Sequence, residues 1–283
     1  MGISTAIMMS GSGSNARKII ENNSEALDIK VMMSENPRSN YLEIAAENNI
    51  QHFLNDIYSI CGVEHDLNNL TENDRKKLRN KDERKRLDRI TADFFEEFGI
   101  ELVAAAGYDW VMTEQLCEKY IIVNVHPGDL RVKRKNGKPR YAGLGWIPTA
   151  KAILNGEKFA YTSTHIITPG LDEGPIAMIS DPVAINLPAE FNKDNILPED
   201  VTLKTIINDI NYNSGNIYGD ALIYTHSIIV QNKLKEKGDW IIFPETLEEI
   251  ARYMQNGRFT RDPSGILLLD NAPIQDLFLM KSV

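Results

Sequence analysis

Segments typical of β-strands alternate with segments typical of helices from the first residues onward, and this alternation constrains the fold most strongly. Apolar runs at residues 5–9, 29–33 and 51–54 are typical of short strands, while residues 16–20 and 41–48 read as helices. Further strands are predicted at residues 100–106, 120–126, 161–167 and 176–183. The pattern predicts an α/β fold with a Rossmann-like open, mostly parallel twisted sheet flanked by helices. Ligands of such sheets bind beyond the carboxyl ends of the strands.

The later part of the chain has a different pattern. Beyond Pro198 we predict helices at residues 201–211 and 216–237, and a further helix that begins at Pro244. We therefore expect a sheet-forming domain over residues 1–185 and a mainly helical region over residues 186–283 that packs on the same domain.

Residues 61–90 form a strongly basic insertion in the first domain, with acidic residues interleaved among the lysines and arginines. A helix that grips RNA is one interpretation of this insertion. The other is a solvated helical face with ion pairs at helical spacing, which we favour because the stretch has no aromatic residues to stack on bases.

The composition narrows the functional classes. The 283 residues carry a net charge of −9, which argues against a general binder of nucleic acid or membrane surfaces. Cys61 and Cys117 stand outside any metal-ligand spacing, so we expect reduced thiols and no metal site. No apolar run approaches the length of a membrane span, and we expect a cytoplasmic protein.

Asn124 and His126 are the leading candidates for catalysis. They are two residues apart on a predicted strand that ends at Pro127 and Gly128, so their side chains point to the same face. An amide that donates beside an imidazole suits the oxyanion formed at an acyl carbon. The alternative is that His126 caps the turn before Pro127 and that Asn124 hydrogen-bonds the loop.

Three loops beside predicted strand ends add to this candidate site. The glycine-serine turn at residues 10–15 joins a strand to a helix, an arrangement that binds phosphate, although a plain turn with a serine cap would look the same. Asp172 and Glu173 lie between glycines and prolines, in a loop that could orient an imidazole or accept a proton. Its alternative is an acidic surface hairpin. The basic loop at residues 131–140 is typical of a lid or substrate clamp.

Together these stretches resemble the folate-dependent formyltransferase family, and within it the glycinamide ribonucleotide formyltransferases. The resemblance runs from Thr5 to about Val183 in the same linear order. It rests on residues 10–15, 106–108, 124–127, 162–165 and 171–176. Residues 128–131 depart from the family pattern, as do the longer basic insertion and the long tail after Val183.

The resemblance implies the roles of particular residues. The family's catalytic residues fall on Asn124, His126 and Asp172, and its second active-site histidine falls on His165. The loop that cradles the substrate phosphate falls on Gly13, Ser14 and Asn15. The wall of the folate pocket falls on Tyr108, Asp109, Trp110, Val111 and Met112.

The implied activity is transfer of a formyl group from 10-formyltetrahydrofolate, without a metal, to a primary amine. We expect a small, phosphorylated acceptor, 5'-phosphoribosylglycinamide of purine biosynthesis, and a homodimer is one option for the assembly. Formylation of a nucleotide-linked amino sugar is the alternative. A hydrolase of the formyl donor, a methionyl-tRNA formyltransferase and an inactive folate- or nucleotide-binding module are expected less.

Overall fold

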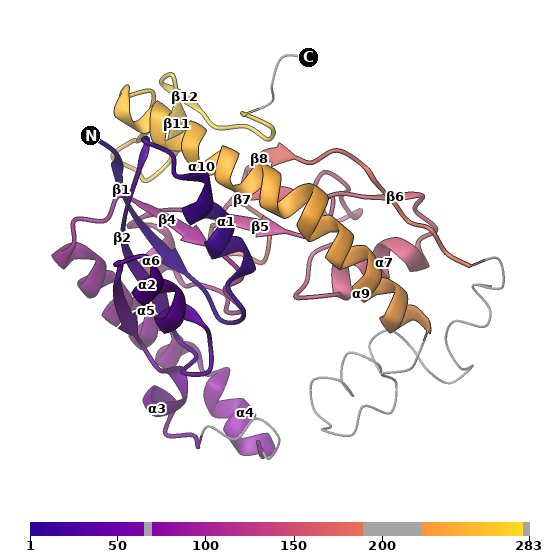
Figure 1. The fold of residues 1–283 in the computed structure, drawn as a ribbon, viewed down its shortest axis with the longest axis horizontal. Helices are drawn as coiled ribbons and strands as arrows, with labels where there is room; N and C mark the ends of the chain where they lie inside the picture. The colour runs from indigo at the N-terminus through magenta and orange to yellow at the C-terminus, as the bar shows by residue number, and fades with distance from the viewer. Residues whose placement is uncertain (65–69, 189–221, 280–283) are drawn as a thin grey trace.

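The computed structural model describes residues 1–64, 70–188 and 222–279 (Figure 1). Within these ranges the central sheet has seven strands in the order β3-β2-β1-β4-β5-β7-β8. Their bounds are β1 Ile3–Met8, β2 Leu27–Ser34, β3 Gln51–Leu54, β4 Leu102–Ala105, β5 Ile121–His126, β7 Ser163–Ile166 and β8 Ile176–Ile179. The strands from β3 to β5 pair in parallel, whereas β7 and β8 are antiparallel. The predicted mostly parallel sheet is therefore confirmed.

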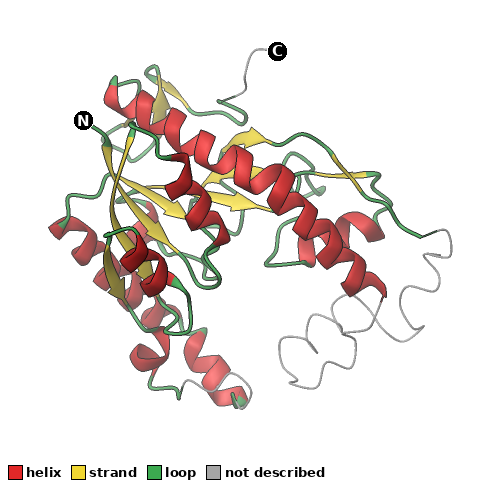
Figure 2. Cartoon of the chain, in the orientation of Figure 1, coloured by secondary structure: helices red, strands yellow, loops and turns green. Residues whose placement is uncertain are grey.

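Helices cover both faces of this sheet (Figure 2). One face packs against α1 (Ser14–Asn22), α2 (Tyr41–Glu47) and α10 (Trp240–Gln255), and the other packs against α5 (Lys81–Glu97) and α6 (Glu114–Cys117). Strand β1 shows why both faces need cover: Ile7 is buried in the first layer, while Ala6 and Met8 are buried in the second. Successive side chains of a strand point to opposite faces, so a strand apolar at every position belongs in the middle of a three-layer fold.

The basic insertion forms α3 (Ile57–Cys61), α4 (Glu72–Leu78) and the start of α5, and residues 65–69 lie outside the described ranges. Its charges are paired at helical spacing, as in Lys76–Glu72 at 3.0 Å, or with neighbouring elements, as in Lys85–Glu114 at 2.6 Å. These contacts agree with the solvated, ion-paired face favoured above. Arg84 differs because it turns inward and places its guanidinium 3.9 Å from the centre of the Trp110 ring.

The helix predicted to begin at Pro244 begins earlier. Helix α9 (Leu222–Leu234), a π-helical turn (Lys235–Asp239) and α10 follow one another directly and form the long helix that crosses the sheet in Figure 1. Pro244 lies inside α10, one turn after the π-helical turn. A proline lacks the N–H of a regular helical bond, and it fits in the turn that follows such an interruption of the bond ladder.

The remaining elements are short. Thr113 occupies the cap position of α6 as predicted, but its hydroxyl makes no capping bond. The predicted helix at 201–211 and the start of the one at 216–237 fall on residues 189–221, outside the described ranges. The other short elements are α7 (Ile147–Leu154), β6 (Phe159–Ala160), β9 (Val183–Ala184), β10 (Phe259–Arg261), β11 (Leu267–Leu269) and β12 (Ala272–Pro273).

Candidate active site

Two neighbouring pockets open beyond the carboxyl ends of β4 and β5. The larger pocket, of about 220 Å³, lies between the loop after β1, the end of β5 and the long C-terminal helix. The smaller pocket, of about 50 Å³, is lined by residues that follow β4 and by residues 170–172. Tyr108, Asn124, Leu144 and Asp172 line both pockets. Two molecules bound side by side would therefore meet at Asn124 and Asp172.

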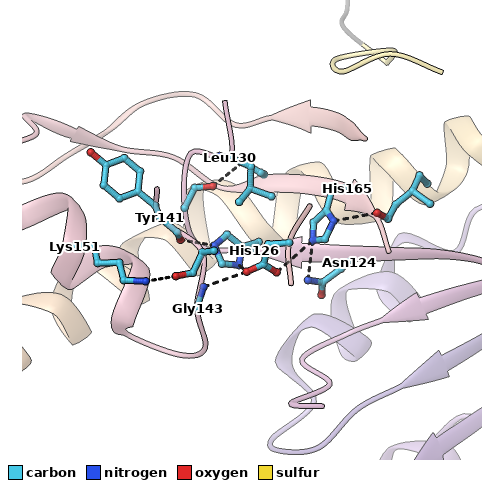
Figure 3. Close-up of polar contacts among 12 residues, drawn as sticks. Asn124, His126, Leu130, Tyr141, Gly143, Lys151 and His165 are labelled. Carbon is cyan, nitrogen blue, oxygen red and sulfur yellow. Dashed lines mark hydrogen bonds and ion pairs between the residues drawn. The ribbon is translucent and has the colours of Figure 1, made fainter. Parts of the chain in front are cut away.

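Strand register brings Asn124 against His165. The two residues are directly paired between the antiparallel strands β5 and β7, so their side chains share one face of the sheet. The nitrogens Asn124 Nδ2 and His165 Nε2 are 3.1 Å apart, and His165 Nδ1 lies 3.2 Å from the Ile166 carbonyl (Figure 3). Because a carbonyl only accepts, His165 carries its proton on Nδ1 and accepts from Asn124 at Nε2.

The charge state of His165 agrees with this tautomer. The side chain is 2% exposed, and burial lowers the pKa of His165 to about 4. A neutral imidazole can accept from Asn124, which leaves the second N–H of the Asn124 amide directed elsewhere. His165 thus fixes the orientation of the amide that lines both pockets.

His126 is held by the end of the loop that follows β5. Its Nε2 lies 2.8 Å from the Tyr141 carbonyl, so this nitrogen carries a proton (Figure 3). Its Nδ1 faces the carboxylate of Asp172, with Nδ1 and Oδ2 3.6 Å apart. His126 is 3% exposed and Asp172 is 8% exposed. A second proton on Nδ1, or a proton on Asp172, is needed to satisfy both groups at this distance.

Asp172 adopts a left-handed backbone conformation, with φ of 55°. Its Oδ2 accepts a 3.1 Å hydrogen bond from the Gly143 N–H, and its Oδ1 lies 3.7 Å from His165 Nε2. Lys151 on α7 donates to the Ala142 carbonyl, between the two residues that bind the imidazole and the carboxylate. Residues 141–143 therefore set His126 and Asp172 relative to each other.

The loop after β1 lines the larger pocket. Gly13 has φ of 74°, and α1 begins at the next residue, so the first N–H groups of this helix have no intrahelical partner. The Asn15 side chain hydrogen-bonds Asp239, and its Oδ1 has no partner among the described residues. Such a helix start favours an anion.

The sequence-based prediction missed the wall supplied by the C-terminal helix. Gln231, Lys235 and Asp239 all line the larger pocket. Asp239 is buried, accepts a 2.7 Å hydrogen bond from Thr162, and has its pKa raised to about 6 by burial. The signal that could have found them is their spacing of four residues, which puts polar side chains on one face of an apolar helix.

The other predicted residues are divided between the two pockets. Tyr108, Trp110, Val111 and Met112 line the smaller pocket, whereas Asp109 lines the larger one. None of residues 131–140, the predicted lid or clamp, lines either pocket. That role in the lining falls to Gly143, Leu144 and Gly145 further along the same loop.

Two searches concern other functional classes. In residues 1–64, 70–188 and 222–279 no group of three histidine, cysteine, aspartate or glutamate side chains is placed to hold a metal ion. No helix in the same ranges is long and apolar enough to cross a membrane.

An amide, two imidazoles and a carboxylate between two pockets define a site for transfer of a group between two bound molecules. Residues 4–188 match the family model described as formyl transferase, and the chain belongs to that family. It is therefore a formyltransferase by class.

Solved structures with the same fold cover nearly the whole chain. The phosphoribosylglycinamide formyltransferase of Coxiella burnetii is 18% identical, with a TM-score of 0.59 over 97% of this chain and 96% of that one. Glycinamide ribonucleotide transformylase 1 of Symbiobacterium toebii is 19% identical, with a TM-score of 0.58 over 95% and 94%. A search of curated proteins gave no match.

Proposed function

We propose that this enzyme transfers the formyl group of 10-formyltetrahydrofolate to a small phosphorylated primary amine, 5'-phosphoribosylglycinamide. The observation that carries the proposal is the meeting of two pockets at Asn124 and Asp172. A phosphorylated amine in the larger pocket and a folate in the smaller one would place the amine beside the formyl carbon there.

The phosphate would lie at the start of α1. The N–H groups of Gly13, Ser14 and Asn15 border the larger pocket, and Lys235 supplies a positive charge to the same pocket. An unsubstituted amine without a phosphate would gain neither contact. The folate would contact Tyr108, Trp110, Val111 and Met112 in the smaller pocket, which is too small for a whole folate and would hold one end of it.

The reaction joins the acceptor nitrogen to the formyl carbon and turns the formyl oxygen into an oxyanion. The Asn124 amide has one N–H on His165 and a second for this oxygen. A donor placed on an oxyanion contributes roughly 3–4 kcal/mol to stabilising the transition state. A proton on His126 Nδ1 would add positive charge beside the same oxygen.

The proton released by the acceptor amine would go to Asp172, which is 3.6 Å from His126 Nδ1. Collapse of the tetrahedral intermediate breaks the bond from the formyl carbon to N10 of the folate. The proton then passes from the Asp172–His126 pair to N10, which yields tetrahydrofolate and the formylated amine. Atoms and charge balance without a further reactant.

An acceptor screen tests the proposal. The full-length protein is mixed with 10-formyltetrahydrofolate and either 5'-phosphoribosylglycinamide, a nucleotide-linked amino sugar or water alone, and release of tetrahydrofolate is followed by absorbance. We expect turnover with the first acceptor and loss of turnover in Asp172→Asn. Turnover with the amino sugar alone would replace the acceptor, and equal release in water would identify a hydrolase.

A further inference from the structure

Glu35 is a buried carboxyl that plays no part in the reaction proposed above. It follows β2 directly, is 1% exposed, and lines neither the larger nor the smaller pocket. Its Oε1 accepts a 3.1 Å hydrogen bond from Trp110 Nε1, and its Oε2 has no partner among the described residues. An apolar residue here would avoid the cost of burying a carboxyl.

Trp110 connects this carboxyl to the smaller pocket, which its ring lines. The indole is held from a second direction by Arg84, whose guanidinium lies 3.9 Å from the ring centre. Arg84 is itself fixed by hydrogen bonds to the Leu78 carbonyl at 3.1 Å and to the Val111 carbonyl at 3.3 Å. The ring is thus bonded at its edge and stacked on one face.

Glu35 also contacts the loop that enters the larger pocket, through a hydrogen bond from the Ser10 hydroxyl. The Ser10 hydroxyl oxygen accepts a 2.8 Å bond from the Asp109 N–H, and the Ser10 N–H donates 2.9 Å to the Gly107 carbonyl. The carboxyl therefore lies where the loop after β1 meets the loop after β4, with one hydrogen bond to each.

We propose that Glu35 is a positioning residue that holds the Trp110 ring as a fixed wall of the smaller pocket and so sets affinity for the folate co-substrate. The inference rests on the proposed function, because it identifies the ligand of the smaller pocket as a folate. Burial raises the pKa of Glu35 to about 7, against hydrogen bonds from Ser10 and Trp110 that lower it. The chain thus retains a costly group at the position that anchors the wall.

The test compares variants at both ends of the hydrogen bond. Glu35→Leu removes the acceptor, Trp110→Phe removes the donor, and Glu35→Gln keeps an acceptor oxygen. We expect Glu35→Leu to raise the KM for 10-formyltetrahydrofolate about tenfold, the effect of one lost hydrogen bond, while the KM for the amine changes less than about twofold. Glu35→Gln should stay near the wild type. Glu35→Leu combined with Trp110→Phe should match Trp110→Phe alone, because both changes break one bond.

Tyr120→Phe is the matched control. It removes a buried 2.9 Å hydrogen bond to the Ala92 carbonyl on the same face of the sheet, and Tyr120 lines neither pocket. We expect a loss of stability and no change in either KM. Equal effects of Glu35→Leu and Tyr120→Phe on both KM values would overturn the inference. If Glu35→Leu does not fold, Trp110→Phe with and without Glu35→Gln decides the same question.

A binding measurement separates this inference from the proposed function. The probe is 5-formyltetrahydrofolate, an isomer of the donor, titrated calorimetrically into the wild type and the variants. Binding that weakens in Glu35→Leu and is restored in Glu35→Gln supports the inference even if the wild type formylates no amine in the acceptor screen. Equal binding by all variants, or none by the wild type, overturns it.

Discussion

Replacing Glu35 by glutamine should change how the stability of the protein depends on pH. Burial raises the pKa of Glu35 from 4.5 to about 7, so in this interval the folded protein holds a proton that the unfolded chain releases. A raised folded pKa means that the stability contributed by the protonated group is complete below pH 4.5 and is lost as pH rises through 7. Integrated from pH 5 to pH 8, the loss is about 2.5 kcal/mol.

Glu35→Gln has no proton to lose and should escape this loss. The assay is urea unfolding of wild type and variant at pH 5, 6, 7 and 8, read by circular dichroism. The amide adds an offset that does not vary with pH, so the informative quantity is the change in the difference between the two free energies of unfolding. That difference should move by about 2.5 kcal/mol in favour of the variant as pH rises. A difference that stays constant, as expected for the exposed control Glu101→Gln, would refute the buried, uncompensated carboxyl.

Three further predictions concern the active site. Asn124→Ala should lower kcat roughly hundredfold or more in the steady-state assay, because it removes an oxyanion donor, and circular dichroism should show an intact fold. Lys151→Met should lower kcat while both KM values stay near those of the wild type, since Lys151 anchors the Ala142 carbonyl and touches no substrate in the proposed mechanism; an unchanged kcat would contradict that role. Gly238→Ala places a Cβ 2.4 Å from Thr162 Oγ1 and should cost about 1–3 kcal/mol in urea unfolding, with a raised KM for the amine.

The layers of the fold could be predicted because burial on both faces leaves a direct trace in the sequence. A run such as residues 5–9 is apolar at every position, and residues on alternate positions are buried in different layers. The juxtaposition of Asn124 and His126 could likewise be predicted, because two residues on a strand repeat the same direction. Asp172 entered the prediction only through family resemblance, and the structure puts its carboxylate within 3.7 Å of both imidazoles.

The C-terminal wall of the larger pocket could not be predicted in the same way. Helical periodicity at Pro244 indicates a helix start, since it carries no information about a π-helical turn that absorbs the proline one turn earlier. That turn also determines where Lys235 and Asp239 face. Local propensity likewise favoured a cap at Thr113, whereas the buried Asp88 carboxylate takes the Thr113 N–H at 2.5 Å. Tertiary contacts decide both cases.

The backbone of the loop after β5 determines where the reactive proton can be. The Tyr141 carbonyl requires a proton on His126 Nε2, and the Gly143 N–H favours negative charge on Asp172. A neutral His126 would then present a lone pair to a carboxylate at 3.6 Å, a repulsive contact that one further proton removes. Uptake of a proton from the acceptor amine is therefore favourable at this pair, and the same proton is in place for the departing N10. The chemistry we propose thus depends on two backbone groups in residues 141–143, which explains why the basic residues earlier in that loop can vary in position without entering the site.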